Sequence, residues 1–162
     1  MKNFPKRKKI RMENFDYSSS HAYFLTICSK DREPIFWKKQ YLKDVGADII
    51  RPYDRMSEIG QVIDKAINQI SEHYSNVIVD KYVIMPDHVH LIVFLLSDDD
   101  GRMISAPTVS VIVGQMKRWV SKEVGHTVWQ KSFIDRVIRN EAGYRAAWNY
   151  IESNPYVFDE KH

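Results

Sequence analysis

The sequence predicts an α+β domain in which an antiparallel sheet carries helices on one face. Its 162 residues are 44% hydrophobic and 28% charged, which is typical of a soluble globular domain. Short runs rich in β-branched and aromatic residues alternate with longer segments whose apolar residues recur every three or four positions. No run approaches the roughly 18 apolar residues of a membrane span, so none is expected.

The chain is predicted to begin with an arm and to continue as one domain. Residues 1–20 are polar, basic and serine-rich, and we interpret them as a basic N-terminal arm on a single domain of residues 21–162. The first strand is predicted over residues 21–29, whose aromatic and β-branched side chains favour burial. Residues 30–52 are expected to be irregular because they include two prolines.

A helix and a hairpin follow. Residues 57–74 are predicted to be helical because their apolar side chains recur at i, i+3, i+4 and i+7, and Ser57 can cap the first turn. Residues 77–85 and 88–96 are predicted strands, joined tightly by a Pro-Asp pair.

The last three predicted elements complete the topology. A second helix spans residues 108–124 and stops at Gly125, a strand spans residues 132–139, and Asn140 caps a final helix that Asn154-Pro155 is expected to end. The order β-α-β-β-α-β-α is the split βαβ, or ferredoxin-like, arrangement. It places an antiparallel sheet against helices on one face and adds one helix at the C-terminus.

The cysteine content indicates the compartment. Cys28 is the one cysteine of the chain, which forbids an internal disulfide and excludes a zinc site built from clustered cysteines. The N-terminus lacks the apolar core of a signal peptide. We therefore expect a cytoplasmic protein that is not exported.

Positive charge is concentrated in the arm. The formal net charge is +3, yet residues 1–11 hold six Lys and Arg residues and no acid, so the remainder stands at −3. A basic tail on a near-neutral body is typical of contact with a polyanion, most often nucleic acid, although it can also simply aid solubility. The arm residues expected to contact DNA are Lys6, Arg7, Lys8, Lys9 and Arg11.

Residues 85–91, MPDHVHL, carry the strongest functional signal. Alternation along a strand puts His88 and His90 on one face and their apolar neighbours on the other. Two converging imidazoles can coordinate a metal ion, but a hydrogen-bonded pair of strand histidines has the same pattern. The alternation directs Asp87 away from the histidine face unless the turn reorients it, and Asp87 is not expected to be a ligand.

A second group of residues lies in the last helix. Apolar residues from Tyr144 to Ile151 define its buried stripe. Tyr150 and Asn154 fall to one side of that stripe and, being four residues apart, lie next to each other. They are placed to reach a neighbouring site, although an ordinary boundary tyrosine and a helix-ending asparagine would show the same spacing.

These segments resemble a known family. MPDHVHL is similar to the HUH motif (His, bulky apolar residue, His) of single-tyrosine transposases, and residues 150–155, YIESNP, resemble the helix that carries their nucleophile. The resemblance spans about residues 17–156. Further segments resemble the REP-associated branch of these transposases, namely Tyr17-Ser18, YFLTIC at residues 23–28, WQKSF at residues 129–133, and Asp135.

The resemblance implies a ferredoxin-like nuclease that cuts single-stranded DNA with a tyrosine and uses Mg²⁺ or Mn²⁺. The matching positions are Tyr150 as the nucleophile and His88, His90 and Asn154 as the metal ligands. At the position of Asn154, insertion-sequence relatives often have Gln. The REP-associated branch has Asn there, as this chain does. The implied partner is single-stranded or hairpin DNA at REP-like repeats. A monomer is favoured over the dimer with exchanged tyrosine helices of insertion-sequence relatives.

Elementary chemistry agrees with this function. A tyrosine of pKa about 10 is a weak nucleophile at neutral pH, so a cation that polarises the phosphate is needed. Attack leaves a 5′-phosphotyrosine and a free 3′-hydroxyl, and the covalent link allows rejoining without ATP. The sequence accordingly has no G-x-x-x-x-G-K-[ST] motif. Two histidines and an amide bring no negative charge, so the scissile phosphate is expected to complete the site.

Residues 102–139 form a second basic region with a net charge of +5. Trp119 and Trp129 could stack on bases, although core packing is the favoured role for each. Such a run of charge is also typical of an ordinary solvated face. The residues of this region expected to contact DNA are Lys117, Arg118, Lys131, Arg136 and Arg139.

Two other functions stay open. A non-catalytic protein could keep this fold and recognise repeat hairpins without cutting them, although the presence of both histidines and Tyr150 disfavours it. A histidine-triad phosphate-ester hydrolase would need His-x-His-x-His, and Ile92 occupies the third position.

Overall fold

The computed structural model describes residues 21–42, 52–96 and 108–161. The predicted arm, residues 1–20, lies outside this part of the chain. Within the described ranges, no helix combines the length and the apolarity that crossing a bilayer requires. In chain order the elements are β1 (His21–Cys28), the 3₁₀ helices η1 (Lys30–Arg32) and η2 (Lys39–Tyr41), α1 (Pro52–Arg55), α2 (Glu58–His73), β2 (Val77–Ile84), β3 (His88–Leu95), α3 (Val109–Val124), β4 (Ile134–Ile138) and α4 (Glu141–Lys161).

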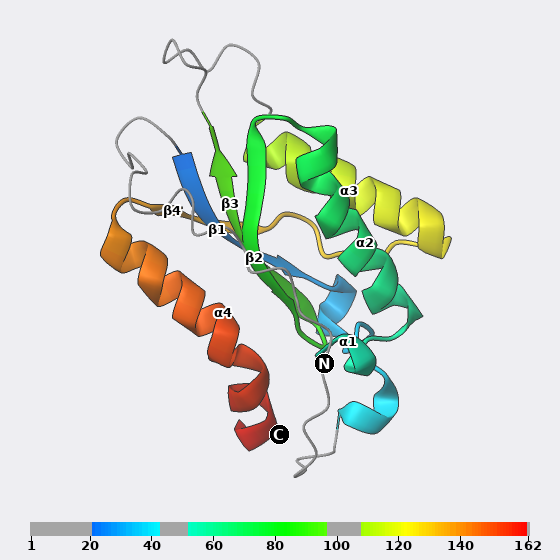
Figure 1. The fold of residues 1–162 in the computed structure, drawn as a ribbon. Coiled ribbons are helices and arrows are strands. Elements are labelled where there is room, and N and C mark those ends of the chain that lie inside the picture. Colours follow the sequence, from blue (N-terminus) through cyan, green and yellow to red (C-terminus); the bar gives the residue numbers. More distant parts are fainter. Residues whose placement is uncertain (1–20, 43–51, 97–107, 162) are drawn as a thin grey trace, which may run out of the picture.

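The four strands form one antiparallel sheet in the order β2-β3-β1-β4. Helices α2 and α3 lie side by side on one face of this sheet, and α4 crosses the other face against β2 and β3 (Figure 1). The predicted ferredoxin-like class with an added C-terminal helix is therefore confirmed. The addition gives the sheet a second, separately covered face.

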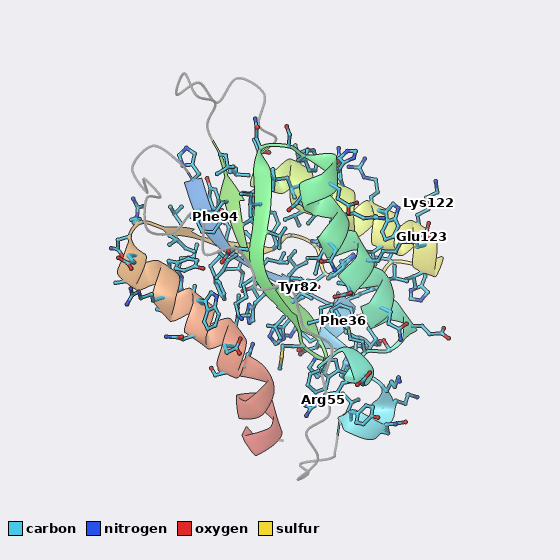
Figure 2. All side chains as sticks on the ribbon, viewed as in Figure 1. Phe36, Arg55, Tyr82, Phe94, Lys122 and Glu123 are labelled. Carbon is cyan, nitrogen blue, oxygen red and sulfur yellow. The ribbon has the colours of Figure 1, made fainter. Side chains whose placement is uncertain are left out.

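The core lies mainly between the sheet and the α2–α3 layer. Alternate residues of β1 and β3 point into it, and apolar side chains of both helices meet them. Phe36 lies in this layer, whereas Lys122 and Glu123 project from the outer side of α3 (Figure 2). Fully buried members include Leu25, Ile27, Phe36, Ile63, Ile67, Val89, Leu91 and Val120.

The predicted helix caps are present. The Ser57 side chain accepts a hydrogen bond from the Gly60 N–H at 3.1 Å, and that of Asn140 accepts one from the Gly143 N–H at 2.8 Å. Gly125 ends α3 with φ of 93°, a left-handed conformation that costs glycine little. These local signals fix the starts of α2 and α4 and the end of α3.

Other boundaries differ from the prediction. The four strands are shorter than predicted by one or two residues at an end, as is usual where ladders fray. The stretch expected to be irregular contains η1 and η2, and α1 starts at Pro52, because the fixed φ of proline suits a first helical turn.

The predicted end of the last helix is wrong, since α4 continues through Pro155 to Lys161. A proline cannot donate to the carbonyl four residues earlier, and its ring crowds that carbonyl. Such a residue can bend a helix instead of ending it, and Figure 1 shows the axis of α4 changing direction in its last turns. The missing hydrogen bond at Pro155 therefore does not end α4, contrary to the prediction.

Gly60 tests the packing beneath α2. A Cβ at this position would lie 2.2 Å from the Phe36 carbonyl oxygen, so Gly60→Ala should destabilise the protein by about 1–3 kcal/mol. The matched control is Gly114→Ala in α3, where the nearest atom to a new Cβ is Arg118 Nη2 at 4.0 Å. It should stabilise the protein by about 0.5–1 kcal/mol. Urea unfolding measures both changes, and equal effects would contradict this packing.

Candidate active site

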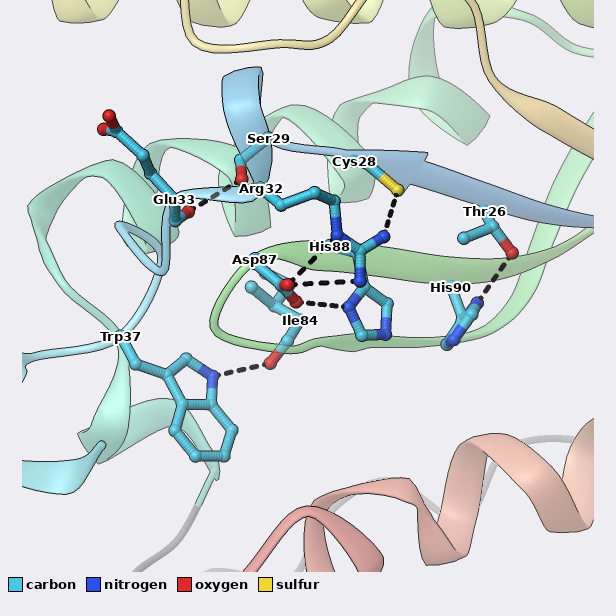
Figure 3. A network of polar contacts seen from close by, with 10 residues as sticks. All are labelled: Thr26, Cys28, Ser29, Arg32, Glu33, Trp37, Ile84, Asp87, His88 and His90. Carbon is cyan, nitrogen blue, oxygen red and sulfur yellow. Dashed lines mark hydrogen bonds and ion pairs between the residues drawn. The ribbon is translucent and has the colours of Figure 1, made fainter. Parts of the chain in front are cut away.

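The two histidines of β3 lie together on the sheet face that α4 crosses. The ring centroids of His88 and His90 are 4.6 Å apart with an interplanar angle of 71°. The intervening Val89 and the following Leu91 are fully buried on the opposite face. The alternation predicted from the sequence therefore brings two imidazoles to one point (Figure 3).

His90 is held in a buried pocket of the sheet. Its Nδ1 is 3.0 Å from the Thr26 hydroxyl, and its ring stacks on Phe24 at 5.0 Å. The residue is 5% exposed, and its Nε2 has no hydrogen-bond partner among the described residues. Burial, followed by the charge of nearby His88, lowers the pKa of His90 to about 3. At neutral pH the ring is therefore uncharged and can act as a metal ligand.

His88 has a different partner. Its Nδ1 lies 2.6 Å from Asp87 Oδ1 (Figure 3). Asp87 Oδ2 accepts a hydrogen bond from Arg32 Nε at 3.1 Å and forms an ion pair with Arg32 Nη2 at 3.1 Å. Burial alone would raise the pKa of Asp87, but the hydrogen bond with His88 and the charges of His88 and Arg32 hold it below its ordinary value. The carboxylate is thus ionised in contact with the ring.

Of the two orientations that the sequence left open for Asp87, the structure has the one in which the turn reorients the side chain toward the histidines. Asp87 lies in the tight connection before β3 and outside the strand. Strand alternation therefore does not set its direction. The connection turns the carboxylate back onto the ring of His88.

Tyr150 of α4 lies over the histidine pair. Its ring meets His90 at 5.2 Å and Phe24 at 5.9 Å, edge-on in both cases. The residue is 52% exposed, so the same ring touches the buried pocket and solvent. Asn154 follows one turn later, and its Nδ2 is buried without a partner among the described residues. Tyr150 thus joins the histidines, and the amide lies on the same side of α4.

A β-bulge in β2 anchors α4. The pairing of β2 with β3 shifts between Val79 and Lys81. The Tyr144 hydroxyl donates to Asp80 Oδ2 at 2.5 Å, while Lys81 forms an ion pair with Glu152. The Lys81 ammonium also lies 3.8 Å from the ring centroid of Trp148. Consecutive side chains of a regular strand point to opposite faces, so the bulge explains why both Asp80 and Lys81 reach α4.

The donor atoms fit a divalent cation. His90 Nε2 and Asn154 Nδ2 are buried and have no hydrogen-bond partner in the described part of the chain, which is costly unless a ligand uses them. Rotation about the last side-chain bond exchanges the amide nitrogen for oxygen, a donor that hard cations prefer. Among the described residues no three His, Cys, Asp or Glu side chains cluster as a metal site. The available set is therefore two imidazoles and an amide, none of which carries a negative charge.

The predicted DNA-contact residues fall into different environments. Lys117 is half-buried, and its ammonium donates to the Gln130 carbonyl at 3.0 Å and to that of Ser132. Burial lowers the pKa of Lys117. Arg136 is exposed and pairs with Phe24 in the register, so it shares the face that carries the histidines. Arg118, Lys131 and Arg139 are also exposed, and the arm residues Lys6, Arg7, Lys8, Lys9 and Arg11 lie outside the described ranges.

The two tryptophans of the basic region pack mainly inward. Trp129 is 5% exposed and packs against Phe36, with ring centroids 5.3 Å apart and an interplanar angle of 59°. Trp119 is partly buried against the core. The preference for core packing is thus confirmed for Trp129, whereas Trp119 keeps part of its ring accessible.

Sequence reasoning missed Thr26 and Arg32. Thr26 faces His90 because β1 and β3 pair in a register that joins these two residues, and this register was not predicted. Arg32 reaches Asp87 from η1, in a stretch expected to be irregular. The sequence places Arg32 four residues after Cys28, which it contacts. Nothing in the sequence indicated that Arg32 also contacts Asp87, in the connection between β2 and β3.

The low pKa of His90 predicts loss of stability in mild acid. Between pH 7 and 5 the unfolded imidazole takes up a proton that the folded one refuses, because its pKa falls from 6.5 to about 3 on folding. The free energy of unfolding should therefore fall by about 2 kcal/mol over this interval. His90→Gln should remove most of this dependence in urea titrations, whereas His126→Gln, at an exposed site, should retain it. Equal pH slopes in all three proteins would contradict the assignment.

Known proteins resemble this chain in sequence and in fold. No protein-family model matches the sequence. An "Uncharacterized protein" of Haemophilus influenzae is 25% identical over 173 aligned residues, covering 95% of this chain and 91% of the relative. Another protein of that organism, named "Putative REP-associated tyrosine transposase", is 27% identical over 157 residues, covering 89% of this chain and 76% of the relative.

A solved structure agrees with these sequence matches. The structure of a REP-associated tyrosine transposase bound to a REP hairpin superposes with a TM-score of 0.57 at 21% identity, covering 84% of this chain and 67% of that chain. At this identity the match establishes a shared fold. Through its relatives and its fold together, the chain is similar to REP-associated tyrosine transposases, and the resemblance indicated by its motifs is confirmed.

Proposed function

We propose that this protein is a REP-associated tyrosine transposase, an HUH endonuclease that cuts and transfers single-stranded DNA through Tyr150. The observation that carries the proposal is the position of the Tyr150 ring, which is half exposed and 5.2 Å from buried His90. A purely structural tyrosine would not need to meet a pair of histidines that includes an unsatisfied nitrogen. The sequence relative named for this activity supports the same function.

The chemistry assigned to Tyr150 is an in-line displacement. The phenol loses its proton, its oxygen forms a bond to the scissile phosphorus, and the bond from phosphorus to the 3′ oxygen breaks. That oxygen takes up a proton and leaves as a 3′-hydroxyl, while the 5′ end stays on the enzyme as a phosphotyrosine. Attack by another 3′-hydroxyl reverses these steps and transfers the strand.

His88, His90 and Asn154 are the residues that would hold Mg²⁺ or Mn²⁺. When bound, the cation polarises the phosphate and offsets the charge that develops in the transition state. The low pKa keeps the His90 ring unprotonated, and packing against Phe24 fixes its plane. Because none of the three donors carries a negative charge, tight binding needs an anionic partner, which the DNA phosphate supplies.

Hairpin DNA is the proposed partner. The structural neighbour is bound to a REP hairpin, and exposed Arg136 shares the histidine face of the sheet in this chain. Arg118, Lys131 and Arg139 add exposed positive charge, and the arm adds six further cations. A monomeric enzyme is part of the proposal, since α4 packs on β2 and β3 and Tyr150 contacts His90 without exchange of helices.

Tyr150→Phe should abolish the covalent adduct and leave DNA binding nearly intact. Only the attacking oxygen is removed, while the ring retains its contacts with His90 and Phe24. Labelled hairpin DNA is incubated with protein and Mn²⁺, and the denaturation-resistant adduct is measured on a gel. Binding is measured separately by fluorescence anisotropy.

The matched control is Tyr82→Phe, whose hydroxyl bonds Asp64 of α2 at 2.6 Å on the other side of the sheet. This variant should form the adduct at the normal level. Undiminished adduct in Tyr150→Phe would refute the assignment of the nucleophile. Tight hairpin binding by the wild-type protein without any adduct would favour the non-catalytic DNA-binding function.

Deletion of residues 1–11 should lower the affinity for DNA. It should also make that affinity less dependent on salt concentration. The deletion removes six cations from a body whose formal charge is −3. If all six contact single-stranded phosphates, the slope of log K against log salt becomes shallower by about 4 units. Binding isotherms over a salt series with specific and scrambled hairpins measure this change. Since phosphate contacts do not read sequence, site preference should persist; an unchanged slope would show that the arm does not contact DNA.

A further inference from the structure

We propose that Asp87 and Arg32 are positioning residues for the metal-binding ring of His88, an inference that rests on the proposed function. Asp87 fixes the proton of His88 on Nδ1, and Arg32 fixes Asp87. This arrangement leaves the lone pair of His88 Nε2 directed away from the carboxylate and free to bind a cation.

The contact between Asp87 and His88 carries the first step. An ionised carboxylate only accepts hydrogen bonds, so the 2.6 Å separation between Asp87 Oδ1 and His88 Nδ1 requires the proton on Nδ1. The ring is 15% exposed and the carboxylate 22% exposed, which limits competition from water. A neutral His88 in this contact must then present an unprotonated Nε2.

The position of Asp87 is itself determined by several contacts. The Asp87 carbonyl accepts from the Ser29 N–H at 2.9 Å, and the Pro86 carbonyl accepts from the Phe36 N–H at 2.9 Å. These bonds join the connection between β2 and β3 to the segment after β1. The carboxylate is therefore held by backbone on one side and by Arg32 on the other.

Arg32 divides its guanidinium between two partners. Nε and Nη2 both contact Asp87 Oδ2, while Nη1 donates to Cys28 Sγ at 2.8 Å (Figure 3). The backbone that presents it is strained, since Asp31 and Arg32 have φ of 55° and 57°. Non-glycine residues persist in this region only where surrounding contacts hold them. The fork onto Asp87 and Cys28 is such a contact.

His90 provides the internal comparison. Its Nδ1 meets the neutral Thr26 hydroxyl, which can donate or accept. His88 alone in the pair has an anionic partner, which both sets the proton position and increases the basicity of the opposite nitrogen. In a site whose proposed ligands carry no negative charge, this carboxylate supplies negative charge next to them.

The first test is the position of the ring proton in the free protein. Nitrogen-15 NMR at neutral pH should show the His88 proton on Nδ1 in the wild-type protein, and a mixture of the two tautomers in Asp87→Ala. Asp31→Asn is the matched control, because Asp31 is exposed and asparagine tolerates its positive φ. It should match the wild type. A His88 proton on Nε2 in the wild type, or an unchanged tautomer in Asp87→Ala, would overturn the proposal.

The second test measures Mn²⁺ affinity in complexes of hairpin DNA with proteins that also carry Tyr150→Phe, so that no cleavage occurs. Removal of such an outer carboxylate typically weakens metal binding by about 10–100-fold. We expect a loss in this range for Asp87→Ala, a smaller loss for Arg32→Ala, and partial recovery with Arg32→Lys. Asp31→Asn should bind as the parent does. Equal affinity in the parent and Asp87→Ala would overturn the proposal even if both fold normally.

These measurements separate this inference from the proposed function. The tautomer experiment uses neither DNA nor cleavage, and the affinity experiment uses a protein that cannot form the adduct. A wild-type protein that forms no phosphotyrosine adduct would refute the nuclease and leave both readouts of Asp87 interpretable. If the wild-type protein forms the adduct but its His88 proton is not fixed on Nδ1, the positioning role alone is refuted.

Discussion

The docking of α4 on the second face of the sheet is the constraint on which the site depends. The histidines come from β3, whereas Tyr150 and Asn154 come from a helix joined to the chain only after β4. The bulge next to Asp80 allows two consecutive residues of β2 to hold this helix, one through Tyr144 and one through Glu152 and Trp148. Without that irregularity, one of the two anchors would face α2 instead.

The sheet separates stability from chemistry. The face toward α2 and α3 is filled with fully buried aliphatic side chains. Their removal from water is the main contribution to the stability of the fold. The opposite face carries the two histidines, Thr26 and Phe24 under a half-exposed tyrosine. In each histidine Nδ1 has a protein partner. The rigid layer thus supports two rings whose orientation is already set before any ligand arrives.

The sequence predicted the features that depend on local periodicity and capping. Ser57, Gly125 and Asn140 act within one helical turn, and the alternation of His88 with Val89 is a property of any strand. It did not predict features that need distant partners, such as the Thr26–His90 register or the turn of Asp87 onto its neighbour. The passage of α4 through Pro155 was missed because a local penalty was treated as decisive. The register and the turn arise from tertiary contacts that no short window contains.

The order of elements along the chain has a consequence for synthesis. A polypeptide emerges from the ribosome N-terminus first, so His88 and His90 are made about 60 residues before Tyr150. Both central strands and their α2 cover can form while the tyrosine helix is still being translated. A partly made chain thus holds the proposed metal-binding histidines without the proposed nucleophile. The two parts of the proposed chemistry therefore meet only after α4 has been translated.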